Sequence, residues 1–172
     1  MKARAGEHPF GDPGQLIALG AFLVVWIGDS FFLRASTALS AFVPLAVRLI
    51  VCAVLLIVAL LLFRSGHVVV SHERRPTGVL TTGAFRYVRH PLYLASLLTY
   101  LGLTVSTASL LTLGLTIGIF VFHDYIAGYE ERFMETHFGE EYARYKRVTG
   151  KWIPRIPAAS PAKARAREKD TR

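Results

Sequence analysis

The sequence GAFRYVRHPLY, residues 83–93, decides how this chain is expected to fold. A cation and an imidazole, Arg89 and His90, stand directly before Pro91, and Tyr93 follows two residues later. Proline suits the first turn of a helix, because its missing N–H would have no intrahelical partner there. Long apolar segments flank the stretch on both sides. We therefore expect a helix to begin at Pro91 and to hold this polar cluster where the chain enters a membrane.

The composition indicates an integral membrane protein with one domain. Of the 172 residues, 52% are hydrophobic and 19% are charged, and the apolar residues occur in long runs. Runs of this length are typical of membrane spans. A net charge of +8 would suggest nucleic acid as the partner of a soluble protein. Here the cations cluster beside apolar segments, so we expect contact with the lipid bilayer and no nucleic acid.

Hydropathy and charge divide the chain into segments. The expected fold is an all-α integral membrane protein with about four transmembrane helices in two hairpins and a cytoplasmic C-terminal extension. The expected segments are a cytoplasmic leader at 1–14, a first transmembrane hairpin at 15–63, a basic connector at 64–90, a second hairpin with its extension at 91–155, and a disordered basic tail at 156–172.

The distribution of Lys and Arg predicts the orientation. The leader holds Lys2 and Arg4, and the connector and C-terminal region are rich in cations, whereas the links expected on the other side hold only Arg34. Cations concentrate on the cytoplasmic side, so both termini are expected in the cytoplasm of a bacterial-type cell, with the protein in its inner membrane. Asp29 and Arg48 lie in apolar runs near the outer side, where a structural ion pair or a snorkelling arginine is expected.

The last hydrophobic segment is expected to extend beyond the membrane. Helix-forming residues continue from Leu110 to His137, which is about 42 Å of helix. The hydrocarbon core is about 30 Å thick, so the last third of this helix should stand in water. Gly139 is expected to end the helix, and a short helix over 140–147 should follow it. Trp152 is expected to anchor the chain at the interface.

The two ends of the second hairpin should meet at one level of the membrane. Glu130 and Glu131 would then lie beside the cluster at 89–93, and Tyr142 and Tyr145 would fold back next to them. Cations, carboxylates and aromatic rings together suit a small zwitterionic ligand. No metal is expected, because the histidines have no metal-ligand spacing with a cysteine: His67, His72 and His123.

The runs GAFRYVRHPLYLAS, EERFM and HFGEEYARYKRV, followed by WIP, resemble the isoprenylcysteine carboxyl methyltransferase family. That family is related to the phospholipid N-methyltransferases. The resemblance covers roughly residues 77–155. It implies a helical membrane methyltransferase that uses S-adenosylmethionine, with the cofactor held on the cytoplasmic side by residues 91–155. A lipid-like acceptor, either an amphiphilic small molecule or a prenylated substrate, would reach the methyl donor through a gap between helices.

The resemblance also implies roles for single residues, carried over motif by motif. The implied catalytic residues are Arg89, His90 and Glu131. The implied cofactor-binding residues are His90, Tyr93, Glu130, Glu131, Tyr142, Tyr145 and Arg147, with Lys146 as the alternative to Arg147. A carboxylate acceptor needs no general base at neutral pH, whereas an ammonium acceptor must first lose a proton. His90 or Glu131 would be that base.

Other functions stay open on the sequence alone. A phospholipid N-methyltransferase would use the same donor with a lipid amine as acceptor. An NADPH-dependent membrane reductase of the steroid-reductase type resembles the HPxY pattern, although the acid pair followed by HFGEEY favours a methyltransferase. A small membrane scaffold without enzymatic activity would bind neither cofactor. The identity of the acceptor and the oligomeric state have no signature in the sequence.

Overall fold

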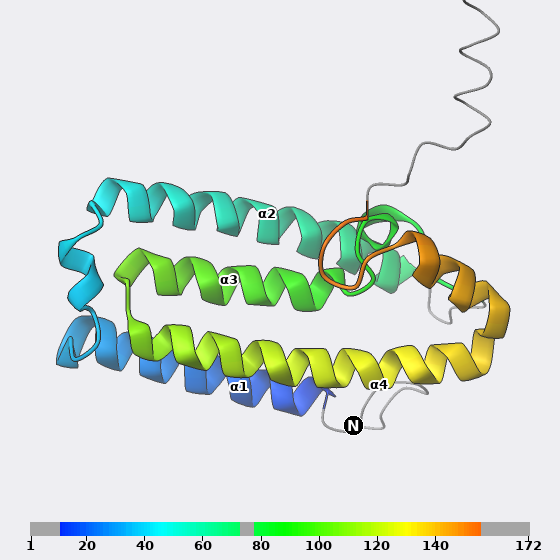
Figure 1. Ribbon diagram of the computed structural model, residues 1–172, viewed down its shortest axis with the longest axis horizontal. Coiled ribbons are helices and arrows are strands. Elements are labelled where there is room, and N and C mark those ends of the chain that lie inside the picture. Colours follow the sequence, from blue (N-terminus) through cyan, green and yellow to red (C-terminus); the bar gives the residue numbers. More distant parts are fainter. Residues whose placement is uncertain (1–10, 73–77, 156–172) are drawn as a thin grey trace, which may run out of the picture.

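The computed structural model describes residues 11–72 and 78–155, and their helices lie side by side in one bundle (Figure 1). The long helices are α1 (Gly11–Ile27), α2 (Leu45–His72), α3 (Pro91–Thr107) and α4 (Leu110–Val148). Short helical turns connect them: η1 (Gly28–Leu33), η2 (Ala38–Ala41) and η3 (Gly83–Arg86). The described residues contain no strand, only one isolated parallel bridge, so the all-α class predicted from the sequence is confirmed for this part of the chain.

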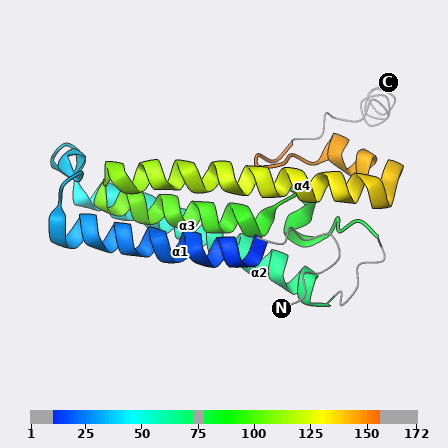
Figure 2. The ribbon, with the colours of Figure 1, turned by 90° about the horizontal axis from the view of Figure 1, so that it is seen from below.

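The helices have the length and hydropathy of an integral membrane protein. Helices long and apolar enough to cross a membrane occupy Pro13–Leu33, Leu45–Val68 and Leu110–Val148. The remaining apolar helix, α3, has 17 residues and is shorter. It lies between α2 and α4 in Figure 1 and between α4 and α1 in Figure 2, and it contacts all three. Its neighbours therefore cover most of its surface, and little of that surface remains to contact lipid.

The helix ends differ from those expected from hydropathy. α1 begins at Gly11, so residues 11–14 are its first turn instead of an irregular leader. Proline is tolerated there because the N–H groups of a first turn have no intrahelical acceptor, and Pro13 uses this freedom. α2 continues to His72, whereas the first hairpin was expected to end at residue 63. Hydropathy marks where a membrane ends, but helical structure can continue past that level.

Small residues let α2 and α3 pack closely. Cys52, Ala59 and Gly66 recur at a heptad spacing on α2 and are buried, as are Ala95 and Gly102 on α3. A Cβ atom added to Gly102 would lie 3.5 Å from the backbone oxygen of Cys52. Small side chains of this kind allow close backbone approach between helices in membranes. This seam sets the depth of α3 in the bundle and with it the position of Pro91.

An aromatic core joins α1 to α3 and α4. Phe22 is fully buried and packs against Tyr100 with 4.7 Å between ring centroids. Leu97 and Ile119 complete the cluster. Trp26 adds a hydrogen bond from its indole Nε1 to the carbonyl of Leu103 at 3.0 Å. Indole suits this place because its ring packs in the core while its N–H still has an acceptor.

A buried carboxylate closes the end of the bundle farthest from Pro91. Asp29 is 1% exposed. It accepts hydrogen bonds from the Oγ of Ser36 at 2.5 Å and from the Oγ of Ser109 at 2.6 Å. The Ser109 Oγ in turn accepts the backbone N–H of Thr112 at 3.2 Å and caps the start of α4. Asp29 therefore connects η1 to the first turn of α4 through two hydroxyl groups.

Of the two alternatives expected for Asp29 and Arg48, the ion pair was wrong, because it is not among the ion pairs of the described residues. Arg48 donates from Nε to the carbonyl of Val43 at 3.1 Å and from Nη1 to the carbonyl of Ser106 at 2.8 Å. Ser106 lies at the C-terminal end of α3, where carbonyls lack intrahelical partners. Each charged group thus satisfies helix-end polar groups instead of the other charge.

The seam between α2 and α3 makes a testable prediction. Gly102→Leu should lower the thermal midpoint of the purified protein in detergent by several degrees, because overpacking a close interface costs about 1–3 kcal/mol. Gly114→Leu is the matched control, since a Cβ atom at Gly114 meets no other atom within 4 Å. Equal midpoints for the two variants, measured by intrinsic fluorescence, would contradict the seam.

Candidate functional site

The Arg89 guanidinium fastens the start of α3 to the C-terminal part of α4. Its Nε donates to the Oε1 of Glu131 at 2.9 Å, and both side chains are 8% exposed. Its Nη1 donates to the carbonyls of Thr149 at 2.7 Å and Lys146 at 3.3 Å. Its backbone N–H donates to the carbonyl of Gly150 at 2.9 Å. A buried ion pair with this many further hydrogen bonds fixes geometry well, and a lysine could not reproduce it.

Gly150 allows the backbone at the end of α4 to turn back toward α3. A Cβ atom at this position would overlap the carbonyl oxygen of Ile153, so the turn requires glycine. Val88 forms the isolated parallel bridge with Gly150 and is 1% exposed. The loop that precedes α3 is therefore held against the turn that follows α4.

His90 lies between two carboxylates. Its Nε2 is 3.1 Å from the Oε1 of Glu131, and its Nδ1 is 3.7 Å from the Oε2 of Glu130. Glu130 also accepts a hydrogen bond from the hydroxyl of Tyr93 at 2.6 Å. The Glu130 side chain is 22% exposed, compared with 8% for Glu131. The structure brings five residues into one cluster, as the sequence predicted: Arg89, His90, Tyr93, Glu130 and Glu131.

Glu131 is held in its ionised form. It lies beyond the first roughly 20 residues of α4, which suffice to cross the hydrocarbon core. Burial raises the pKa of Glu131, but hydrogen bonds from His90 and Arg89 outweigh burial and hold the pKa at about 2. The Lys146 Nζ lies 3.5 Å from its second oxygen. With a cationic or donor group on both oxygens, this carboxylate is a weak base at neutral pH.

The tyrosines that follow Gly139 are buried next to this cluster. Gly139 has φ 49° and ψ −121°, which ends the first part of α4 and confirms the break expected there. Tyr142 and Tyr145 are 4% and 7% exposed. Burial raises the pKa of both phenols, so they stay neutral. Tyr145 donates its hydroxyl hydrogen to the carbonyl of Phe85 at 2.6 Å, which fastens η3 to α4.

Arg147 is the one proposed cofactor-binding residue that the structure does not bring to the cluster. Its side chain is 61% exposed, and its Nη2 contacts Glu140 at 2.6 Å. The neighbouring Lys146 reaches Glu131 and also Glu135 at 2.7 Å. Consecutive residues on a helix point about 100° apart, so only one of two adjacent cations can face the cluster. That cation is Lys146.

Trp152 and Asp124 join the site although sequence reasoning assigned them no role in it. The Trp152 Nε1 donates to the Oδ1 of Asp124 at 2.8 Å, and Lys151 Nζ donates to the same oxygen at 2.5 Å. The Trp152 ring lies 5.8 Å from the His90 ring. Trp152 is therefore part of the wall beside His90. The only sequence signal was its place after the basic run, which does not identify its partner.

His123 is the other residue that the sequence did not assign. It is 1% exposed, and among the described residues neither ring nitrogen has a hydrogen-bond partner. Its ring stacks on Tyr93 at 5.1 Å and 16°, and Tyr93 also stacks with His90 at 5.8 Å and 15°. Buried polar atoms are nearly always hydrogen-bonded in proteins. The His123 nitrogens therefore mark a place where a ligand or water atom belongs.

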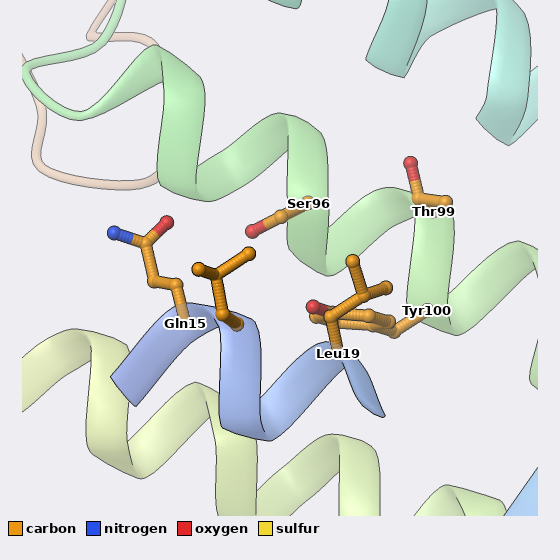
Figure 3. Close-up of a pocket in the computed structure, with 6 residues that line it drawn as sticks. Gln15, Leu19, Ser96, Thr99 and Tyr100 are labelled. Carbon is orange, nitrogen blue, oxygen red and sulfur yellow. The ribbon is translucent and has the colours of Figure 1, made fainter. Parts of the chain in front are cut away.

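A groove of about 300 Å³ opens between α1 and α3 (Figure 3). It lies along α3 from Ser96 to Tyr100, beginning within one turn of Tyr93. Gln15 and Leu19 extend from α1 toward the α3 side chains in the close-up. The volume is at the lower end of the range for small-molecule sites. It offers an apolar channel within one turn of the polar cluster.

Comparison with known proteins places this site within a family segment. The model of the phospholipid methyltransferase family matches residues 44–141, which include α2, α3 and the acid pair. No solved structure matches the chain. Among the described residues, no group of three or more His, Cys, Asp or Glu side chains could hold a metal ion.

Curated relatives match shorter segments. The cobalt-zinc-cadmium resistance protein CzcN of Cupriavidus metallidurans is 34% identical over 84 residues, 48% of this chain and 38% of that protein. Protein-S-isoprenylcysteine O-methyltransferase of Schizosaccharomyces pombe is 28% identical over 92 residues, 53% of this chain and 39% of that protein. An uncharacterized protein of Haemophilus influenzae is 38% identical over 63 residues, 36% of this chain and 100% of that protein.

The chain thus spans about two fifths of the length of the first two relatives. The family match covers more than half of the chain and confirms the resemblance drawn from its motifs. The chain belongs to the phospholipid methyltransferase family of membrane methyltransferases.

Proposed function

We propose that the protein transfers a methyl group from S-adenosylmethionine to a lipid-like acceptor that reaches the site from the membrane. The observation that supports this most is the position of His90 between Glu130 and Glu131, at the end of a membrane helix and inside the family segment. A phospholipid N-methyltransferase is the second candidate, since the matching family model carries that description. An NADPH-dependent reductase and a scaffold are not favoured, because the family and the yeast relative are methyltransferases.

The residues of the cluster fit a methyl donor that carries a positive charge on sulfur. Glu130 is the more exposed carboxylate and offers its negative charge to such a cation. The Trp152 ring offers an aromatic face, which attracts cations and stacks on flat rings, whereas the Tyr93 ring already stacks with His90 and His123. When bound, the donor would supply an electrophilic methyl group to the lone pair of the acceptor. The task of the chain is to align the acceptor with that methyl group and to exclude water.

The acid pair divides into two roles in this proposal. Glu131, with a pKa of about 2, keeps its charge and positions Arg89 and His90 instead of accepting a proton. His90 is then the group that takes a proton from an ammonium acceptor, because the imidazolium that forms would stand between two carboxylates. For a carboxylate acceptor no proton moves, and His90 serves to orient.

The acceptor would enter through the groove between α1 and α3. This groove faces the apolar part of the bundle and ends near Tyr93, so it can hold a hydrocarbon chain while the polar end reaches the cluster. His123 would give that polar end a hydrogen bond, since its ring nitrogens are unpartnered among the described residues. A prenylated cysteine carboxylate and a phospholipid amine both meet this description.

We further propose that α3 is the fourth span of a bundle with both termini in the cytoplasm of a bacterial-type cell. At 17 residues α3 is about 25 Å long, slightly shorter than the hydrocarbon core. Its enclosure by the other helices makes this length sufficient. The charge distribution supports a cytoplasmic position for the cluster, on the side where a nucleoside-derived donor is found.

Glu130→Gln tests how the donor is bound. Removing the carboxylate should weaken binding of S-adenosylmethionine by about tenfold or more, because a charge-assisted interaction is lost. Binding of S-adenosylhomocysteine, whose sulfur carries no charge, should change much less. Calorimetry on the purified protein measures both constants, with the exposed Glu140→Gln as the matched control. Undiminished donor binding in Glu130→Gln, or stabilisation of the wild type by NADPH alone, would overturn the assignment.

The lowered pKa of Glu131 predicts a pH dependence of stability. The folded-state pKa is about 2 and the ordinary pKa of a glutamate is 4.5, so the group contributes stability that is present above pH 4.5 and is lost as the pH falls toward 2. The thermal midpoint of the wild type should exceed that of Glu131→Gln at pH 7, and the difference should shrink from pH 4.5 to pH 3. A difference that is constant over this range would show that Glu131 carries no such stabilisation.

The chemistry of the product distinguishes the two acceptor classes. With methyl-labelled donor, vesicles and a prenylated cysteine, we expect label that mild alkali releases, because carboxyl methyl esters hydrolyse. Alkali-stable label in phosphatidylethanolamine would instead identify the second candidate. Ser96→Leu, which partly fills the groove, should reduce transfer at least fivefold while donor binding stays the same. Full transfer by this variant would exclude the groove as the entry path.

A further inference from the structure

A second cavity lies at the end of the bundle opposite the Arg89–Glu131 pair. It has a volume of about 380 Å³ and opens between η1, the loop that follows it, the start of α2 and the end of α3. Figure 1 shows this end at the left, with the short turns η1 and η2. Two arginines, Arg34 and Arg48, line the cavity together with several hydroxyl side chains. Neither the family motifs nor the methyl-transfer site involves these residues.

The cavity carries positive charge without a matching anion in the described part of the chain. Arg48 is half-buried and donates only to neutral carbonyl oxygens, those of Val43 and Ser106. Arg34 is exposed and takes part in no ion pair among the described residues. Asp29 lies close in sequence, but its carboxylate accepts from serine hydroxyls and forms no ion pair with either arginine. Two guanidinium groups therefore line one cavity, and neither forms an ion pair with a carboxylate of the described residues.

The rest of the lining combines hydroxyl donors with an apolar margin. Ser40, Thr37 and Thr107 contribute hydroxyl groups. Thr37 donates to the carbonyl of Arg34 at 3.4 Å and Thr107 to that of Leu103 at 3.5 Å. The guanidinium groups are therefore the main donors open to an oxyanion. Leu45 and Leu49 are 58% and 50% exposed and flank Arg48 in the first turns of α2. The cavity thus presents two cations with exposed apolar side chains beside them. A ligand that matches both parts is an amphiphile with an anionic head.

We propose that this cavity binds the phosphate group of an anionic phospholipid in the leaflet opposite the methyl-transfer site. Arg34 and Arg48 would hold the phosphate oxygens, and Leu45 and Leu49 would contact the first part of an acyl chain. The exposed leucines favour a lipid over free phosphate, which would use only the polar half of the lining. A bound head group would add to the hydrogen bonds that already join these elements at this end, from Ser30 to Thr107 and from Arg48 to the carbonyl of Ser106. The proposal is independent of the methyl donor and its acceptor.

Native mass spectrometry of the purified full chain in detergent tests this site. Dioleoylphosphatidylglycerol should bind to the wild type, and Arg34→Gln should weaken that binding at least fivefold. Arg64→Gln is the matched control, because Arg64 is an exposed cation at the other end of the same helix, α2. Arg34 is an exposed loop residue, so its replacement should leave the fold intact, which an unchanged thermal midpoint verifies. Equal lipid binding by Arg34→Gln and the wild type, or equal weakening by Arg64→Gln, would overturn the proposal.

Two further ligands distinguish the sources of the phosphate. Dioleoylglycerol, which lacks the phosphate, should not occupy the site. Inorganic phosphate at the same concentration should not displace the bound phosphatidylglycerol. Binding of dioleoylglycerol as tight as that of the phospholipid would show a purely apolar site. Displacement by inorganic phosphate at equal concentration would show a site for the free anion, and either result rejects the lipid assignment.

Discussion

The buried pair between Arg89 and Glu131 is the contact on which the arrangement of the site depends. It joins the start of α3 to the C-terminal part of α4, and the same guanidinium donates to the carbonyls of Thr149 and Lys146. Loss of one partner of a buried pair leaves an uncompensated charge, which costs about 3–5 kcal/mol. That energy is a large fraction of the total stability of a domain, which is about 5–15 kcal/mol. The pair therefore fixes which residues of α3 and α4 face each other, and His90 takes its place between the acids because Arg89 is held next to it.

The seam between α2 and α3 supplies the second constraint that the pair requires. A helix of 17 residues is short for a bilayer, and hydrophobic mismatch alone would leave its depth poorly defined. Close packing of Gly102 against the backbone of Cys52 fixes that depth. The pair at Arg89 then fixes how the loop before Pro91 meets the turn at Gly150. The packing of Gly102 fixes the position of α3 along the membrane normal, and the pair at Arg89 fixes its position across the bundle. Together the two contacts determine where the polar cluster lies.

Local chemistry explains which parts of the structure the sequence could predict. A proline after a polar pair predicted the start of α3, and a glycine with positive φ predicted the break at Gly139. Other features depend on side chains that are distant in the sequence or on backbone carbonyl groups. Trp152 meets Asp124 across 28 residues, and Arg48 bonds to backbone carbonyls that no sequence pattern displays. Hydropathy predicts only the part of a helix that lies in the hydrocarbon core, so it did not predict that α2 continues to His72.

The acid pair illustrates why identical neighbouring residues can serve different purposes. Consecutive side chains on a helix point about 100° apart, so Glu130 and Glu131 cannot face the same partners. Glu131 turns toward Arg89 and Lys146 and is enclosed by them. Glu130 turns toward Tyr93 and keeps part of its surface open. His90 contacts both carboxylates. A change of charge at the more exposed Glu130 therefore acts on the same imidazole ring whose other nitrogen contacts the buried Glu131. In this arrangement the enclosed acid maintains the geometry, and the open acid is the one available to a cationic ligand.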